Sequence, residues 1–119
     1  NTLTSTNTDQ ALTAAQGKKL NDEKLAITSA FGVGQINQNV TSSRVANTTY
    51  TNSTGKDIFI MVTSGAGNNI TVAGYVNDAV VVSSQTSSAY GGITSITFHV
   101  PNGSTYKVTG SFSQWVEYR

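Results

Sequence analysis

Carboxylates that could act as acid, base or nucleophile are few and scattered along the 119 residues. Three of the six acidic residues lie within the first 30 positions, and the other three, Asp57, Asp78 and Glu117, are isolated from one another. Hydrolysis of a glycan needs two carboxylates at a fixed separation across the scissile bond. The sequence does not place such a pair, so we predict no catalytic residues and no enzymatic activity.

Metal and nucleotide sites have equally little support in the sequence. His99 is the only histidine and cysteine is absent, whereas a metal site needs several such ligands at close spacing. The glycine pairs Gly32/Gly34 and Gly65/Gly67 are not followed by a helix whose N-terminus could hold a phosphate. We predict no metal and no cofactor, and we expect His99 to face solvent or an interface. The alternative is an ion held by three copies of His99 on a three-fold axis.

Two groups of loop residues combine an aromatic side chain with polar or small neighbours. They are Tyr75 with Asn77 and Asp78, and Tyr90 with Gly91 and Gly92. A sugar ring has an apolar face and a polar rim, so an aromatic ring beside hydrogen-bonding groups suits it, and exposed Tyr also suits protein receptors. We predict these six residues as the receptor-binding candidates. The alternative is structural, with Tyr75 closing the core and Tyr90 stabilising its own loop.

Composition excludes two kinds of partner. The net charge is +1 and no basic run exceeds Lys18-Lys19, so the chain lacks the basic patch that neutralises phosphates. The longest apolar run, residues 79–82, is far too short to span a membrane. We therefore predict no nucleic-acid partner and no membrane insertion. Because the chain begins with Asn1 and not with Met, we also expect a longer parent chain.

Residues 10–28 are predicted to form a helix after a polar linker, with Asp9 as its N-cap. One face carries a narrow stripe, made by Leu12, Gln16, Leu20, Glu23 and Ile27. A lone helix of this length is marginal in water. It either packs on its own domain or forms a short coiled-coil shaft with copies of itself, and the thin seam flanked by charges favours the shaft.

From Gly32 onward the helical period disappears and short β-type runs follow. We predict strands over residues 33–38, 44–50, 58–62, 70–75, 79–82 and 93–100, and two more between residues 106 and 118. The continuous apolar run 58–62 predicts a strand buried on both faces. Residues 83–92 are predicted to be a ten-residue polar loop. The whole predicts a mainly β fold with a short N-terminal helix, in which residues 31–119 form an antiparallel sandwich or jelly-roll-like domain.

Several ordered motifs resemble the tail fibres of tailed bacteriophages. Residues 8–20 read Thr-Asp-Gln-Ala-Leu-Thr-Ala-Ala-Gln-Gly-Lys-Lys-Leu, which resembles the short helix near the end of many such fibres. The motifs Gly-Val-Gly-Gln at 32–35, Tyr-Thr-Asn-Ser-Thr-Gly at 50–55 and Val-Pro-Asn-Gly-Ser-Thr-Tyr at 100–106 resemble the C-terminal knob of these fibres, as does the ending Trp-Val-Glu-Tyr-Arg. One departure is Ile36, close to where the family commonly has an aromatic residue.

The resemblance implies a homotrimeric fibre tip on the virion, made in the host cytoplasm, that mediates adsorption by binding a bacterial surface glycan, lipopolysaccharide or outer-membrane protein. Residues 1–30 would be the linker and helical shaft, and residues 31–119 the knob. Leu12, Gln16, Leu20 and Ile27 would pack between subunits, and Gln35 and Asn37 would lie near the three-fold axis. The alternative is the knob of a tail needle, which acts in portal plugging and genome ejection of short-tailed phages.

Overall fold

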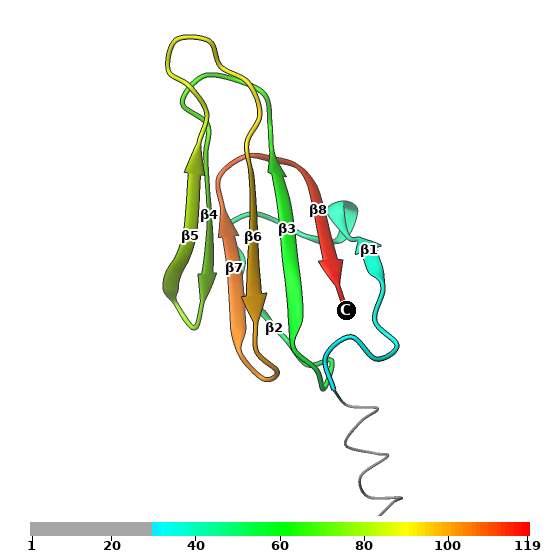
Figure 1. Cartoon of the computed structure of the whole chain (residues 1–119). Coiled ribbons are helices and arrows are strands. Elements are labelled where there is room, and N and C mark those ends of the chain that lie inside the picture. The colour runs from blue at the N-terminus through cyan, green and yellow to red at the C-terminus, as the bar shows by residue number, and fades with distance from the viewer. Residues whose placement is uncertain (1–29) are drawn as a thin grey trace, which may run out of the picture.

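The computed structural model describes residues 30–119, which form eight strands and one short 3₁₀ helix (Figure 1). The elements are β1 (Asn37–Asn39), η1 (Thr41–Ser43), β2 (Tyr50–Thr51), β3 (Ile58–Ser64), β4 (Thr71–Val76), β5 (Ala79–Gln85), β6 (Ser95–Val100), β7 (Thr105–Thr109) and β8 (Phe112–Tyr118). The mainly β fold class is confirmed. The predicted helix over residues 10–28 lies outside the described residues.

The strands form two sheets of four, which we call sheet A and sheet B. Their orders are β1–β8–β3–β6 in sheet A and β2–β7–β4–β5 in sheet B, and all neighbouring strands are antiparallel. Among the described strands, only β4 and β5 follow one another within one sheet. Every other connection carries the chain to the opposite sheet, which is the winding of an eight-stranded jelly roll.

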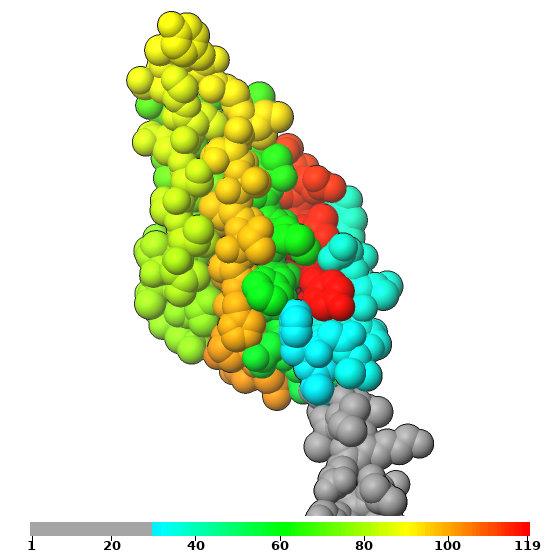
Figure 2. All heavy atoms as spheres, in the orientation of Figure 1, coloured from blue at the N-terminus to red at the C-terminus, as the bar shows by residue number. Residues whose placement is uncertain are grey.

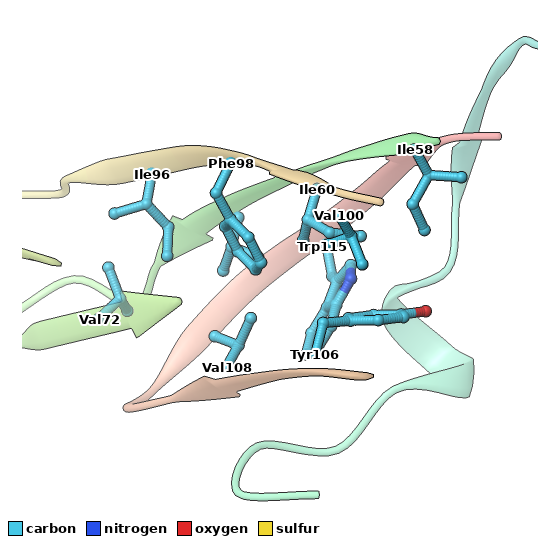
Figure 3. Packing of buried hydrophobic residues seen from close by; sticks show 10 residues of the cluster. Ile58, Ile60, Val72, Ile96, Phe98, Val100, Tyr106, Val108 and Trp115 are labelled. Carbon is cyan, nitrogen blue, oxygen red and sulfur yellow. The ribbon is translucent and has the colours of Figure 1, made fainter. Parts of the chain in front are cut away.

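The core lies between the sheets and is built mainly by alternate residues of β3, β6, β7 and β8, with Val72 from β4. In β6, Ile96, Phe98 and Val100 are buried while Thr97 and His99 are exposed, as the alternation predicts. Figure 3 shows the core side chains of the two sheets pointing toward one another. The buried apolar cluster consists of Ile58, Ile60, Val62, Val72, Ile96, Phe98, Val100, Tyr106, Val108 and Trp115.

Two predicted strands are shorter in the structure. The predicted strand 33–38 is shortened at its start, because residues 31–34 form a turn in which Gly34 has a φ of 71°. Backbone pairing begins at Ile36, which exchanges hydrogen bonds with Arg119, and β1 itself begins at Asn37. Within the predicted strand 44–50, only Tyr50 is paired. Asn47 has a φ of 64°, and its backbone N–H donates to the carbonyl of Val108 at 2.8 Å. A left-handed residue interrupts the extended backbone there.

Two other predictions about strands are wrong. β3 is not buried on both faces, because Phe59 and Met61 point away from the core and are only half-buried. β5 does not end at residue 82 but continues to Gln85, which pairs with Thr71 of β4. The loop between β5 and β6 therefore covers residues 86–94.

The two ends of the sandwich carry different segments. We call the end where β3 begins the proximal end; there Phe31 packs against Phe59, with ring centroids 5.3 Å apart, and against Tyr118 at 5.6 Å. The opposite, distal end carries the β3–β4 loop (residues 65–70) and the β5–β6 loop (residues 86–94). Both loops rise above the rest of the domain, away from the end where the described chain begins (Figure 1).

A joint made by the Gly-Val-Gly-Gln motif ties the incoming chain to the proximal end. Gly32 and Gly34 have φ values of 91° and 71°, which few other residue types adopt easily. The buried Gln35 side chain accepts a hydrogen bond from the Gly32 N–H and donates to the Asp57 carbonyl at 2.8 Å. The glycines turn the backbone while the amide holds the turn in place.

Candidate functional site

The two predicted receptor-binding groups lie at opposite ends of the sandwich. Tyr90, Gly91 and Gly92 belong to the β5–β6 loop at the distal end. Tyr75, Asn77 and Asp78 belong to the end of β4 and to the turn into β5, at the proximal end. The structure therefore does not bring the six residues together, and one surface cannot use both groups at once.

The two distal loops are bound to each other along their length. The Thr86 N–H donates to the Ile70 carbonyl at 2.9 Å, and the Gly67 N–H donates to the Gly92 carbonyl at 3.1 Å. The Thr86 hydroxyl, in a residue only 7% exposed, accepts from the Ile70 N–H at 2.8 Å and donates to the Gly67 carbonyl at 2.7 Å. Thr86 thus joins the β5–β6 loop to two points of the β3–β4 loop, which fixes the two loops relative to each other.

Gly91 is required by this arrangement. It has a φ of 68°, and a Cβ built on it would lie 2.4 Å from the Asn68 side-chain oxygen and 3.2 Å from the Gly67 backbone. Ser87 and Gly91 form an antiparallel bridge that closes the tip of the β5–β6 loop, and the Ser87 hydroxyl accepts from the Tyr90 N–H at 3.2 Å. The predicted tip residue Tyr90 therefore sits on a short, closed turn.

Tyr90 projects from this turn into solvent. Tyr90 is 94% exposed, and Ile93, three residues later in the chain, is 65% exposed. In Figure 2 the yellow residues around position 90 form the outermost part of the domain. The structural alternative for Tyr90, in which the ring stabilises its own loop, does not match this exposure.

Ile93 is a distal residue that the sequence prediction assigned to a strand. The alternation in β6 contains the signal that would have identified it. Even-numbered Thr94, Ile96 and Phe98 face inward, so Ile93 shares the outward direction of Thr97. Thr86 carried no comparable signal, since nothing in a polar loop sequence distinguishes a buried threonine from an exposed one.

The proximal group is engaged in local structure. The backbones of Asn77 and Asp78 have φ values of 51° and 66°, as the two central residues of a type I′ hairpin turn require. Asn77 also accepts from the Thr105 N–H at 3.1 Å. The Tyr75 ring is half-buried and lies under the Lys107 ammonium, 4.6 Å from its centroid. These contacts account for all three residue types without a ligand.

Glu117 is enclosed in a buried network on β8. Its two carboxylate oxygens accept five hydrogen bonds from four residues: Arg44 Nε and Nη2, both at 2.9 Å, Tyr106 OH at 2.9 Å, Trp115 Nε1 at 3.1 Å and Arg119 Nη1 at 2.7 Å. Glu117 itself is 0% exposed. The carboxylate therefore holds the 44–50 segment, β7 and the C-terminus together, and it is not open to a substrate.

The groups in this network shift one another's pKa values. Burial by itself would raise the pKa of Glu117, but the donors, led by Arg44, outweigh burial and hold that pKa below its usual value. Burial would lower the pKa of Arg44, whereas its hydrogen bonds to Glu117 raise it overall. Burial and the adjacent carboxylate raise the pKa of Tyr106 to about 12. At neutral pH Glu117 and Arg44 are therefore ionised and Tyr106 is neutral.

His99 and Asp57 form an exposed pair at the proximal end. His99 Nε2 lies 2.9 Å from Asp57 Oδ2, and Asp57 Oδ1 accepts from the Asn102 N–H at 2.9 Å. The Asn102 hydrogen bond and then the His99 contact lower the pKa of Asp57. Within residues 30–119, no three His, Cys, Asp or Glu side chains gather as a metal site would need, and no pocket is present.

The predicted subunit contacts are only partly within the described chain. Leu12, Gln16, Leu20 and Ile27 lie outside the described residues. Gln35 is 7% exposed, and its amide is bonded within its own chain. Asn37 is exposed on the outer face of sheet A, paired in register with Tyr118.

Comparison with known proteins adds a finding for the segment that precedes the jelly roll. Residues 1–30 match the family model described as phage tail fiber repeats. No curated protein matches the chain. The family match supports a phage tail fibre protein, and hence a component of the virion tail, while the jelly roll itself lies outside the matched segment.

Proposed function

We propose that this chain forms the tip of a phage tail fibre and that its distal loops bind the host surface. In this proposal residues 31–119 are the knob, the assembly is a homotrimer, and the task is adsorption without catalysis. The receptor is a surface glycan or an outer-membrane protein.

The direction of the chain supports the proposal. The segment that matches fibre repeats ends at residue 30, and Phe31 packs on the proximal end of the sandwich. The distal loops lie at the other end of β3, so they point away from the junction with the fibre segment (Figure 1). A fibre that enters at one end of the knob would present the opposite end to a cell.

The observation that carries the proposal is the exposed Tyr90 on a fixed loop. Tyr is among the residues that contribute most to binding interfaces. A loop already ordered by Thr86 and by the Ser87–Gly91 bridge loses little further freedom on binding, which favours affinity. Residues 86–94 carry no charge, so recognition would rest on the aromatic ring, Ile93 and the hydroxyl and backbone groups around them.

Competition for adsorption tests the proposal. Host cells are incubated with the purified chain, and the adsorption of the corresponding phage is then measured. We expect the wild-type chain to block adsorption and Tyr90→Ala to lose the block, because the substitution removes an exposed ring without disturbing a buried contact. Tyr75→Ala is the comparison at the proximal end. Because the Tyr75 ring is half-buried under Lys107, the melting temperature of this variant is measured first to confirm that it is folded.

The outcomes separate the alternatives. If Tyr75→Ala loses the block and Tyr90→Ala keeps it, the receptor site lies at the proximal end and the distal proposal is wrong. If saturating wild-type chain does not block adsorption at all, a tail-needle knob becomes the better explanation. Where blocking occurs, periodate treatment of the cells should abolish binding to a glycan, and protease treatment should abolish binding to a protein.

A further inference from the structure

The outer face of sheet A carries an apolar centre in two rows of paired residues. Residues paired across antiparallel strands point to the same face. The proximal row is His99–Phe59–Tyr118–Asn37, and the next row is Thr97–Met61–Val116–Asn39. The central four side chains, Phe59, Tyr118, Met61 and Val116, are half-buried, and the outer four are exposed.

An apolar outer face is unusual for an antiparallel sandwich whose outer side meets water. The outer face of sheet B is mixed: Lys107 pairs with Tyr75 and Thr109 pairs with Ala73, while Val80 of β5, which is 55% exposed, also pairs with Tyr75. No Asp, Glu, Lys or Arg belongs to the two rows of sheet A. Figure 2 is a view onto this face, where side chains of β6, β3 and β8 lie next to one another in gold, green and red.

Phe31 extends the apolar centre toward the incoming chain. Its ring contacts those of Phe59 and Tyr118 and remains 47% exposed. The described chain therefore begins at the edge of this patch, one residue before Phe31. The patch, which we define as Phe31, Phe59, Met61, Val116 and Tyr118, has the make-up of a subunit interface: an apolar, uncharged centre inside a polar rim.

We infer that the outer face of sheet A is the surface through which copies of this chain contact one another in the knob. This inference rests on the proposed function in one respect, namely that the fibre segments of several copies run together. If several copies are joined through the segments that precede Phe31, their Phe31 residues lie near a common axis. Because Phe31 belongs to the patch, the patches of the copies then face that axis. In a homotrimer the same patch of each copy would face the three-fold axis. The two rows contain no charged Asp, Glu, Lys or Arg side chain, so the patches can approach one another there without repulsion.

The inference changes the predicted role of two residues. Gln35 is bonded within its own chain, so in this arrangement it fixes the joint and the patch residues make the contact with a neighbouring copy. Asn37 lies at the end of the proximal row beside Tyr118 and belongs to the polar rim of the patch. The distal loops and Tyr90 lie away from the patch and remain free for a receptor.

Cross-linking tests this arrangement, because the natural chain has no cysteine. A single cysteine is introduced by Val116→Cys at the patch or by Thr71→Cys on the exposed part of sheet B. The full chain is treated with a short bis-maleimide and separated under denaturing conditions. We expect a linked two-chain product for Val116→Cys and none for Thr71→Cys. The cross-link forms wherever two patches lie close together, even if other contacts also hold the copies together.

A second pair of variants guards against a cysteine that disturbs folding. Met61→Glu places like charges at the meeting faces and should lower the melting temperature of the assembly or its mass in solution, while Thr71→Glu should change neither. Equal cross-linking at positions 116 and 71, or equal behaviour of the two Glu variants, would overturn the inference. A wild-type chain with the mass of a single copy would overturn it too. None of these results depends on whether Tyr90→Ala loses adsorption.

Discussion

Replacing Glu117 with Gln keeps the side-chain volume and removes the negative charge at the centre of the buried network. The carboxylate accepts five hydrogen bonds through two oxygens. In Gln one of these oxygens becomes an NH₂ group, which cannot accept. If the NH₂ takes the place of Oε1, it faces the Arg44 and Arg119 donors. If it takes the place of Oε2, it faces the donors of Arg44, Tyr106 and Trp115. The Arg44 guanidinium, whose side chain is 13% exposed, would lose its buried counter-charge.

The expected cost follows from the burial of the pair. Removing one partner of a buried ion pair costs about 3–5 kcal/mol, because the other charge stays buried without compensation. Domains of this size have a free energy of unfolding of about 5–15 kcal/mol. Glu117→Gln should therefore remove a large share of the stability. Arg119→Met removes a single donor on a side chain that is 28% exposed, so its cost should be about 1 kcal/mol.

Urea unfolding at pH 7 measures these costs, with protein concentration held constant because assembly contributes to apparent stability. An acid series adds a second test. The pKa of Glu117 is lowered on folding, so its contribution is present above the unfolded value of about 4.3 and is lost as the pH falls below it. The wild type should lose stability over this range, and Glu117→Gln should lack that part of the loss.

The ranking of the variants can refute this reasoning. If Arg119→Met costs as much as Glu117→Gln, or if Glu117→Gln costs less than about 1 kcal/mol, the buried charge is not what holds the segment in place. Replacing both Arg44 and Glu117 with Met should cost less than the sum of the single replacements, because no buried charge from that pair is then left uncompensated.

Three further predictions concern other parts of the domain. Since the pKa of Tyr106 is raised from 10.0 to about 12, wild-type stability should fall between pH 10 and pH 12 by about 3 kcal/mol, and Tyr106→Phe should lack this fall in alkaline unfolding experiments. Gly110→Ala should prevent folding or cost several kcal/mol, measured by thermal unfolding, because its Cβ would lie 1.9 Å from the Thr71 carbonyl oxygen at a φ of 100°. Thr86→Val removes the hydroxyl that links the two distal loops. It should raise amide hydrogen exchange in these loops and weaken the block of adsorption, while the amides of β3 and β8 stay protected. Unchanged exchange would show that the hydroxyl does not order Tyr90.

Much of the fold followed from local pattern. Alternation in residues 93–100 identified which side chains of β6 enter the core, and glycine at position 55 matched a turn with a φ of 85°. The prediction for β3 was wrong. Its run of apolar residues predicts burial on both faces of the sheet, but a single chain buries only the face that points into the core. Local pattern also missed the interruption at Asn47, where the segment bends so that Arg44 can reach Glu117.

The sequence indicated which residue types could form a binding site but not where in the fold they lie. An aromatic residue among small and polar neighbours marked both Tyr75 and Tyr90, but only the winding of the strands puts them at opposite ends of the sandwich. Glu117 sits in a strand rich in aromatic residues, and its burial depends on Arg44, which is 73 positions away in the chain. No local pattern reports a partner at that separation.

The sequence by itself determined the class of the fold, the absence of a sequence-local catalytic or metal motif, and the presence of a fibre-like segment before a β domain. Each of these properties depends on a short stretch of sequence, in which periodicity, turn residues and motif spacing can be read without knowledge of distant contacts. Tertiary structure alone decided which strands pair, which end of the domain carries Tyr90, and that the outer face of sheet A is apolar. Each of these depends on contacts between residues far apart in the chain, whose free energies are set by packing and desolvation across both sheets.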